Sequence, residues 1–406
     1  MHWEAVGGIV LCIVGARLLA QRGSPFPWRV LLWGIGIQLA LGFWLLKSPS
    51  GVALFEHVGR AVTGFLSFAN RGSEFLFGNL VKPEYRQTFG MQVALVIAPT
   101  IIFFSAVIAM LYHLGIIQRI VYAVAWVMAR TMGTSGPESL SAAANIFLGQ
   151  TEAPILIRHY LSSASISELN AIMVGGFATI AGSVLGAYVQ LGISAQALIT
   201  ASLLSAPGGL MLAKLAIPPS GTERPIESYR TQRTTQSLLD AATSGARDGL
   251  MLALNVLAML LAFIAIMALL DAGFAWLHSW LPWMPASLRE LLGWIFLPLA
   301  YALGVPAQDA HTVAQLLGTK IVANEFVAYT DLAGLIQAGT ISPRGAMIAM
   351  YALCGFANIS SIAIQIGGIG SLAPERRDDI VRLGWRAMAI GALTNCLSAS
   401  IASLLS

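Results

Sequence analysis

The chain has 406 residues, of which 57% are hydrophobic and only 10% are charged, and its formal net charge is +4. Soluble domains carry about 25% charged residues, so this composition excludes an ordinary cytosolic enzyme, a nucleic-acid-binding protein and a disordered chain. The mean hydropathy of +0.75 indicates an integral membrane protein. The chain also has 40 glycines and 17 prolines, and many of them stand inside apolar stretches where a plain membrane helix would not favour them.

Eight apolar runs are long enough to be membrane-spanning helices, because a helix needs about 20 residues to cross the hydrocarbon core. In chain order they lie near 4–20, 28–46, 90–115, 170–192, 196–216, 248–271, 343–368 and 385–406. The first run has no Lys or Arg before it and no clear cleavage site after it, so we interpret it as a retained span rather than a signal peptide. The amphipathic stretch Val52–Phe68 is expected to lie in the membrane interface.

Two further apolar stretches, 137–160 and 292–330, are interrupted by Gly, Pro and polar residues. Irregular backbone at membrane depth must be shielded from lipid by other parts of the protein. Both stretches are therefore expected to form re-entrant hairpins rather than plain spans.

Basic residues predict the orientation of the chain, because cytoplasmic loops are enriched in Lys and Arg. The residues expected on the inside are Arg17, Arg22 and Arg29, then Arg224, Arg230, Arg233 and Arg247 around the loop 217–247, and finally Arg376, Arg377, Arg382 and Arg386. This orientation places both termini outside. The segment 47–89 conflicts with it, since that segment would lie outside although it contains Lys47, Arg60, Arg71, Lys82 and Arg86.

The chain contains an internal repeat. The segment GGFATIAGSV, which starts at Gly175, matches CGFANISSIA, which starts at Cys354, in the pattern Gly-Phe-Ala-x-Ile. Each segment follows an interrupted stretch with an intramembrane carboxylate, Glu152 in the first copy and Glu325 in the second. Two copies of hairpin, broken helix and helix are typical of transporters that bind substrate near the membrane midplane, where the repeats meet.

The two carboxylates are costly at membrane depth unless they are paired or hydrated. Near Glu152, the helix breakers Gly149 and Pro154 free backbone groups that can bind a polar ligand; alternatively, this polar cluster only satisfies the hairpin's own backbone. The carboxylate of Glu325 suits two vicinal hydroxyl groups, or else it forms a buried ion pair with Lys320.

Other polar residues inside apolar stretches give weaker signals. Asn145 and Thr179 offer oxygen atoms that suit a monovalent cation. Ser360 and Ser361 either line a polar site or are small residues that let helices pack closely.

These motifs resemble those of the concentrative nucleoside transporters. The resemblance runs from about residue 90 to the C-terminus and rests on NIFLGQTEAP from Asn145, GGFATIAGSV from Gly175, Ser205-Ala-Pro, LGTK and NEFVAY from Leu317, and CGFAN and LAPERR from Cys354. It implies an all-α integral membrane fold with eight transmembrane helices, two opposed re-entrant hairpins, inverted repeats and an interfacial helix. It further implies a homotrimer in the inner membrane of a bacterium, with periplasmic termini.

The resemblance also assigns roles to particular residues. It implies that Gln150, Thr151, Glu152 and Val184 bind the nucleobase, that Glu325, Asn358 and Ser361 bind the ribose, that Phe356 lines the same pocket, and that Asn145, Leu148, Thr179 and Ile180 bind sodium, with Leu148 and Ile180 using main-chain carbonyls. The implied function is sodium-driven uptake of nucleosides such as uridine by an elevator-type movement. Sodium is then the coupling ion, and no cofactor and no nucleic-acid partner are expected.

The predicted organisation follows the repeats. Residues 1–89 supply two spans and the interfacial helix of a scaffold, and 90–136 and 248–286 each supply one scaffold helix; 137–216 and 287–406 are the two repeats, and 217–247 is a cytoplasmic loop. Within transport, the alternative is a proton-coupled nucleoside symporter with Glu152 or Glu325 as proton carrier. A channel would need polar rings along a continuous pore, and a membrane-embedded enzyme would need a metal or nucleophile cluster that the scattered histidines do not supply.

Overall fold

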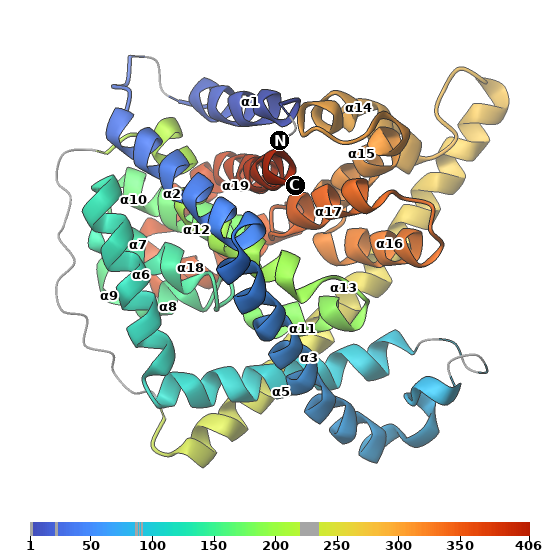
Figure 1. Ribbon diagram of the computed structural model, residues 1–406, viewed down its shortest axis with the longest axis horizontal. Helices are drawn as coiled ribbons and strands as arrows, with labels where there is room; N and C mark the ends of the chain where they lie inside the picture. Colours follow the sequence, from blue (N-terminus) through green and yellow to red (C-terminus); the bar gives the residue numbers. More distant parts are fainter. Residues whose placement is uncertain (1–2, 21–22, 86–87, 89, 91, 220–234) are drawn as a thin grey trace.

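The computed structural model describes residues 3–20, 23–85, 88, 90, 92–219 and 235–406, and this part of the chain forms helices and no strand (Figure 1). Within this described part, six segments are long and apolar enough to cross a membrane. They are α2 (Trp28–Lys47), α5 (Val93–His113), α10 (Ile166–Ala178) with α11 (Gly182–Gln190), α12 (Ala195–Ala216), α13 (Leu238–Trp280), and η3 (Pro374–Arg376) with α19 (Arg377–Leu405). Two apolar helices are shorter, α1 (Ala5–Leu18) and α18 (Ile359–Leu372). The all-α expectation is confirmed, whereas the number of eight spans stays a prediction.

The predicted repeat units are visible as two series of helices. The first consists of α7 (Gly136–Ala144), α8 (Ala153–Leu156) and α9 (Arg158–Leu161), followed by α10 and α11 and then α12. The second consists of α15 (Ala307–Val322) and α16 (Glu325–Gln337), followed by α17 (Pro343–Leu353) and α18 and then α19. We call residues 136–161 hairpin 1 and residues 307–337 hairpin 2.

Both helices with the Gly-Phe-Ala motif are broken in the middle. The break between α10 and α11 spans residues 179–181, and the break between α17 and α18 spans residues 354–358. The two breaks lie against each other, because the backbone N–H of Phe356 donates to the carbonyl oxygen of Thr179 at 3.2 Å. Residues distant in sequence thus meet at the centre of the fold.

Three segments differ from the expectations. Hairpin 2 was expected at 292–330, but α14 (Leu288–Ala302) is a separate helix that continues through Pro298, and the chain turns only at Gly304, whose φ is +79°. The segment 90–136 contains two helices, α5 and α6 (Ile116–Met132), separated by Gly115 with φ +75°. The expected interfacial helix is longer than predicted, since α3 covers Pro49–Phe77, followed by η1 (Gly78–Leu80) and η2 (Pro83–Tyr85).

Part of the glycine excess is explained by the packing of α5 against α13. A Cβ atom added at Gly245 would lie 2.6 Å from the Cβ of Ala109, and one added at Gly249 would lie 2.8 Å from the Cα of Ile102. Small residues allow this close approach of two helix backbones, which dispersion forces stabilise in lipid. These glycines are therefore packing residues and not helix breakers.

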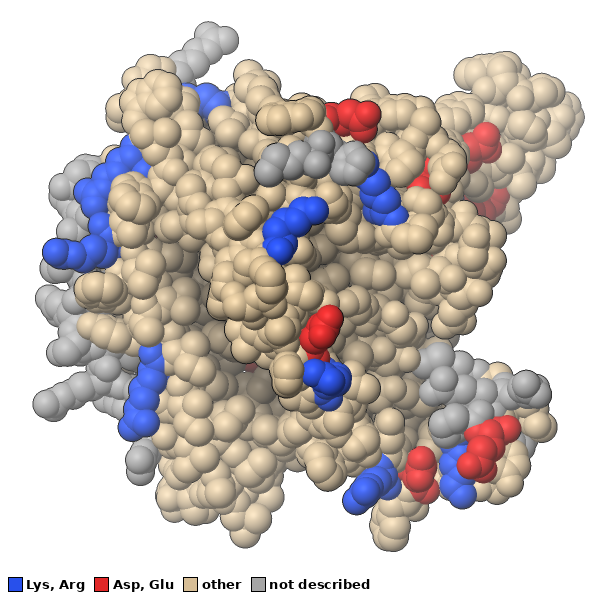
Figure 2. Space-filling view, in the orientation of Figure 1, with Lys and Arg blue, Asp and Glu red and all other residues tan. Residues whose placement is uncertain are grey.

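The face of the molecule in Figure 2 is mostly uncharged. Arg17 donates to the carbonyl oxygen of Leu215 at 3.4 Å, so the end of α1 meets the end of α12. At the other end of the fold, Lys47 donates to the carbonyl oxygen of Ser406 at 3.3 Å. Of the basic residues used to predict the topology, Arg22, Arg86, Arg224, Arg230 and Arg233 lie outside the described residues.

Candidate functional site

The tip of hairpin 1 contacts α18 of the second repeat. Gln150 lies in the turn between α7 and α8, and its side chain is only 7% exposed. Its Nε2 donates to Ser361 Oγ at 3.3 Å, and its Oε1 accepts from Gln365 Nε2 at 3.2 Å. Gln150, which was expected to bind the nucleobase, is therefore in direct contact with Ser361, which was expected to bind the ribose.

Glu325 begins α16, directly after the Asn324 side chain that caps this helix. Its Oε1 accepts from the Tyr188 hydroxyl at 3.0 Å, and its Oε2 accepts from Asn358 Nδ2 at 2.9 Å. All three side chains are buried. A carboxylate offers about four acceptor positions, so two remain for further hydrogen donors such as ligand hydroxyls.

Asn358 connects this carboxylate to the broken helix. Its Oδ1 accepts from the Ser361 backbone N–H at 2.9 Å and thereby caps the N-terminus of α18. Because the oxygen is used by the cap, the amide nitrogen points to Glu325. The break in the second repeat thus fixes the orientation of both Asn358 and Glu325, and Phe356 lies half-buried in the same break.

The residues expected to bind sodium lie where hairpin 1 meets the break between α10 and α11. The Gly182 backbone N–H donates to the carbonyl oxygen of Phe147 at 3.1 Å, which holds the two segments together. Asn145 is fully buried, yet neither its Oδ1 nor its Nδ2 has a hydrogen-bond partner among the described residues. A buried amide without a partner costs about 1–3 kcal/mol. A cation bound to its oxygen would remove part of this cost.

Glu152 faces a cavity of about 390 Å³. The cavity is lined by Leu148, Glu152, Ile155 and Leu156 of hairpin 1, by residues of α5 and α13 such as Ser105, Ser244 and Asp248, and by Ser183 of α11. Its volume lies in the range of about 300–1,000 Å³ that is usual for small-molecule sites. The Glu152 carboxylate also accepts from the Gly149 backbone N–H at 3.1 Å, which bends the hairpin tip.

Two other expected residues lie beside this group without polar contacts of their own. Thr151 packs its methyl group against Gly368 of α18, and Val184 is buried in the first turn of α11. The proposed Glu325–Lys320 ion pair is wrong, since the ion pairs of the described residues do not include it. Lys320 instead donates to the carbonyl oxygen of Ala352 at 2.9 Å and to Asn395 Oδ1 at 2.6 Å.

Three models of known families match the chain. The model for the C-terminus of sodium-dependent nucleoside transporters matches residues 197–403, the model for their N-terminus matches residues 7–80, and a nucleoside recognition model named Gate matches residues 94–195. The chain belongs to the sodium-dependent nucleoside transporter family. The resemblance seen in the sequence motifs is thereby confirmed.

Curated relatives in this nucleoside transporter family are cotransporters and not enzymes. The chain is 39% identical over 415 residues to sodium/nucleoside cotransporter 1 of Sus scrofa, and the match covers 98% of this chain and 63% of the relative. It is 40% identical over 418 residues to solute carrier family 28 member 3 of Mus musculus, covering 98% of this chain and 58% of the relative. The chain thus spans about three fifths of the length of these relatives.

Solved structures of the family match over almost the whole chain. CNTnw in an inward-facing substrate-bound state has a TM-score of 0.93 at 38% identity, covering 99% of this chain and 97% of that one. A CNTnw variant in an outward-facing state has a TM-score of 0.95 at 38% identity, covering 99% and 98%. The family uses sodium as its coupling ion, and among the described residues no group of three or more His, Cys, Asp or Glu side chains could hold a metal ion.

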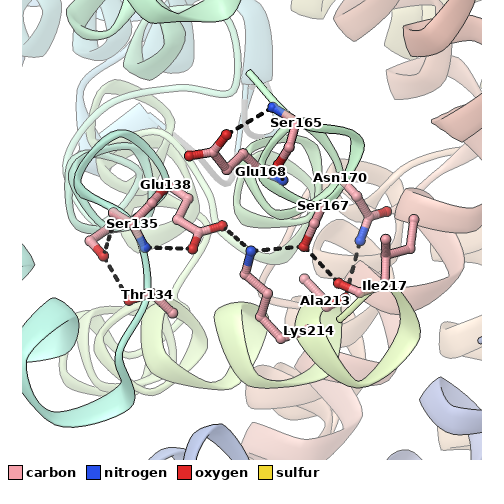
Figure 3. A network of polar contacts seen from close by, with 11 residues as sticks. Thr134, Ser135, Glu138, Ser165, Ser167, Glu168, Asn170, Ala213, Lys214 and Ile217 are labelled. Atoms are coloured by element: carbon pink, nitrogen blue, oxygen red, sulfur yellow. Dashed lines mark hydrogen bonds and ion pairs between the residues drawn. The ribbon is translucent and has the colours of Figure 1, made fainter. Parts of the chain in front are cut away.

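The sequence analysis missed a buried ionic network in the first repeat of the chain (Figure 3). Lys214 Nζ on α12 lies 2.5 Å from Glu138 Oε2 on α7 and donates to Ser167 Oγ on α10 at 2.8 Å. Glu138 Oε1 accepts from the Ser135 backbone N–H at 2.7 Å, and the nearby Glu168 accepts from the Ser165 backbone N–H at 2.8 Å. The sequence signal for this network was a single charged residue inside each of two apolar segments, Glu138 and Lys214. Their pairing requires three helices to meet, which no local pattern indicates.

Proposed function

We propose that this chain is a secondary active transporter that takes up nucleosides such as uridine together with sodium ions. The observation that carries the proposal is the contact between the two polar clusters, since Gln150 of hairpin 1 reaches Ser361, and Asn358 reaches Glu325. One cluster offers amide and hydroxyl groups, which suit the donors and acceptors of a base edge. The other offers a buried carboxylate, which suits the vicinal hydroxyls of a ribose.

In this proposal, Gln150, Thr151, Glu152 and Val184 contact the nucleobase, Glu325, Asn358 and Ser361 contact the ribose, and Phe356 lines the pocket. Several of these side chains already hydrogen-bond one another across the repeats. A nucleoside that enters must replace the Gln150–Ser361 contact with its own groups. Binding therefore separates hairpin 1 from α18 slightly, and Glu152, two residues after Gln150, is proposed to receive the base edge.

Sodium is proposed to bind Asn145 and Thr179 through side-chain oxygens, and Leu148 and Ile180 through main-chain carbonyls. The buried and unpartnered amide of Asn145 supports this assignment. Sodium at this position stabilises the hairpin against the break between α10 and α11, and hence orders Gln150, five residues further along the chain. Ion and nucleoside then favour the same conformation, which is the thermodynamic basis of coupling.

We propose an elevator-type movement in which residues 137–216 and 287–406 move as one unit against a scaffold of 1–136 and 248–286. The backbone bond between Phe356 and Thr179 supports a single moving unit. The cavity between hairpin 1 and helices α5 and α13 supports a boundary between the moving unit and the scaffold at that place. We further propose eight membrane spans, two opposed re-entrant hairpins in inverted repeats, a homotrimer in a bacterial inner membrane, and periplasmic termini.

Uptake of labelled uridine into proteoliposomes tests the function. We expect an inward sodium gradient to accelerate uptake about 5-fold or more over choline, because sodium and nucleoside favour the same conformation. A pH gradient of equal driving force is expected to have no effect, with the membrane potential held constant in both arms. The Asn145→Leu variant should lose the sodium effect, because leucine has similar volume but no ligand oxygen.

The control for this variant is Ser141→Ala, which removes another buried and unpartnered polar atom one turn earlier on α7. It is expected to keep the sodium effect. Acceleration by the pH gradient alone would favour the proton-coupled alternative with Glu152 or Glu325 as carrier. If the unaltered protein takes up no uridine under any gradient, the proposal that it transports nucleosides such as uridine is wrong.

A further inference from the structure

Lys320 on α15 is a buried cation that the proposed site does not use. Its side chain is 2% exposed, and its Nζ donates to the carbonyl oxygen of Ala352 at 2.9 Å and to Asn395 Oδ1 at 2.6 Å. A buried ammonium is stable only when its hydrogens find acceptors. Here those acceptors lie near the C-terminal end of α17 and in the middle of α19, so the ammonium holds hairpin 2 against both helices.

Asn395 continues this chain of contacts to both broken helices. Its Nδ2 donates to the carbonyl oxygen of Ala178 at 2.7 Å and to the carbonyl oxygen of Cys354 at 2.6 Å. The amide orientation is fixed, because the ammonium requires the oxygen and the two carbonyls require the nitrogen. The two amide hydrogens of one fully buried side chain therefore hold the carbonyl of Ala178, the last residue before the first break, and the carbonyl of Cys354, the first residue of the second break.

The position of Lys320 corresponds to the position proposed for sodium. Sodium would lie between hairpin 1 and the broken helix of the first repeat, next to Asn145 and Thr179. The Lys320 ammonium lies between hairpin 2 and the broken helix of the second repeat, next to Ala352. The second repeat thus contains a lysine side chain of its own where the first repeat would take an exchangeable cation.

We propose that Lys320 and Asn395 are positioning residues that transmit sodium binding in the first repeat to the ribose pocket in the second. This inference rests on the proposed sodium coupling. Ala178 directly precedes Thr179, and Cys354 lies four residues before Asn358. When sodium orders the segment 179–180, Asn395 and the Phe356–Thr179 backbone bond order the segment 354–358 with it, because the three segments share these hydrogen bonds.

The test is a linkage experiment on the purified full chain. The Kd of uridine is measured by calorimetry in sodium chloride and in choline chloride, and the ratio of the two values is the sodium linkage. We expect the unaltered protein to have a ratio of about 5 to 150. For Asn395→Leu we expect a ratio within about 2-fold of one, with both Kd values close to the sodium-free value of the unaltered protein.

This pattern separates positioning from a general loss of structure. A variant that merely loosens the pocket weakens binding in both salts and keeps the ratio. The matched control is Thr394→Val, since Thr394 is the neighbouring buried residue and bonds only to Ile390 within its own helix, at 2.8 Å. It should keep the linkage of the unaltered protein.

Lys320→Met and the double variant complete the experiment. We expect Lys320→Met to lower the ratio as Asn395→Leu does, and the double variant to lower it no further, because residues that act as one unit are not additive. If Asn395→Leu does not fold, Asn395→Asp serves instead, since it keeps an acceptor for Lys320 and lacks the amide donors. Full linkage in a folded Asn395 variant would overturn the inference. A ratio of one in the unaltered protein would remove the proposed sodium coupling itself, and the inference with it.

Discussion

Replacing Glu325 with glutamine is expected to weaken uridine binding about 100-fold or more, because this change removes a charged acceptor from a buried site. The carboxylate already accepts from Tyr188 and from Asn358. Its free lone pairs are the proposed acceptors for the two ribose hydroxyls. Hydrogen bonds to charged groups contribute about 1.5–3 kcal/mol each. In addition, the glutamine NH₂ group must face either Tyr188, whose hydroxyl must then accept instead of donate, or Asn358 Nδ2, where two donors meet.

Calorimetry with deoxynucleosides makes this prediction sharper. In the unaltered protein, 2′-deoxyuridine and 3′-deoxyuridine should each bind more weakly than uridine. In Glu325→Gln the difference between uridine and its deoxy analogues should shrink, as expected for two partners of one lost interaction. Glu375→Gln, an exposed carboxylate outside the site, is the control and should bind like the unaltered protein. Unchanged uridine affinity in folded Glu325→Gln would contradict the ribose role.

Replacing Lys214 with methionine is expected to cost about 3–5 kcal/mol of stability, the usual result of removing one partner of a buried ion pair. The side chains of Lys214 and Glu138 are 1% and 0% exposed. The single change leaves the Glu138 carboxylate without its cation, and Glu168 lies in the same network with its Oε1 already unpartnered (Figure 3). Since the network joins α7, α10 and α12, the loss should loosen hairpin 1 first.

Denaturation of the detergent-solubilised protein measures this effect. The double variant Glu138→Gln with Lys214→Met removes both charges and should recover much of the lost stability, because buried pairs contribute little over neutral partners. Arg247→Met is the matched control, since Arg247 pairs with Asp248 at 3.8 Å on the surface. It should cost about 1 kcal/mol or less. If the double variant is no more stable than Lys214→Met alone, the unpaired buried charge of Glu138 is not the cause of the lost stability.

The sequence predicted the helical class and both broken helices because these depend on local properties. Long apolar runs require helices in lipid, and the Gly-Phe-Ala repeat marks the two places where α10 and α17 end. It did not predict α6 as a separate helix, since charged residues such as Arg119 and Arg130 interrupt its apolar pattern. It placed the start of hairpin 2 too early, because 292–330 was treated as one interrupted stretch, whereas Pro298 lies inside the separate helix α14.

The candidate site was predicted only in part. Residue types near Glu152 and Glu325 indicated two polar clusters that meet where the repeats meet. The structure brings Gln150 of one cluster into contact with Ser361 of the other. Tyr188 was not predicted, although it is a direct partner of Glu325. It looks like an ordinary aromatic residue of an apolar helix, and only the crossing of α11 with hairpin 2 gives it a polar partner. The alternative in which Lys320 pairs with Glu325 is wrong, because closeness in sequence says nothing about which acceptors a flexible side chain can reach.

The contact between the two breaks has a consequence for how such a protein can change over generations. The bond from Phe356 to Thr179 uses main-chain atoms only, so substitutions at either position, proline at 356 excepted, leave it in place. The side chains of these residues are then free to diverge under selection for another nucleoside or another coupling ion. The preferred nucleoside or coupling ion can therefore change through single substitutions at these positions. The backbone hydrogen bond that joins the two repeats, and on which their common movement depends, is kept throughout.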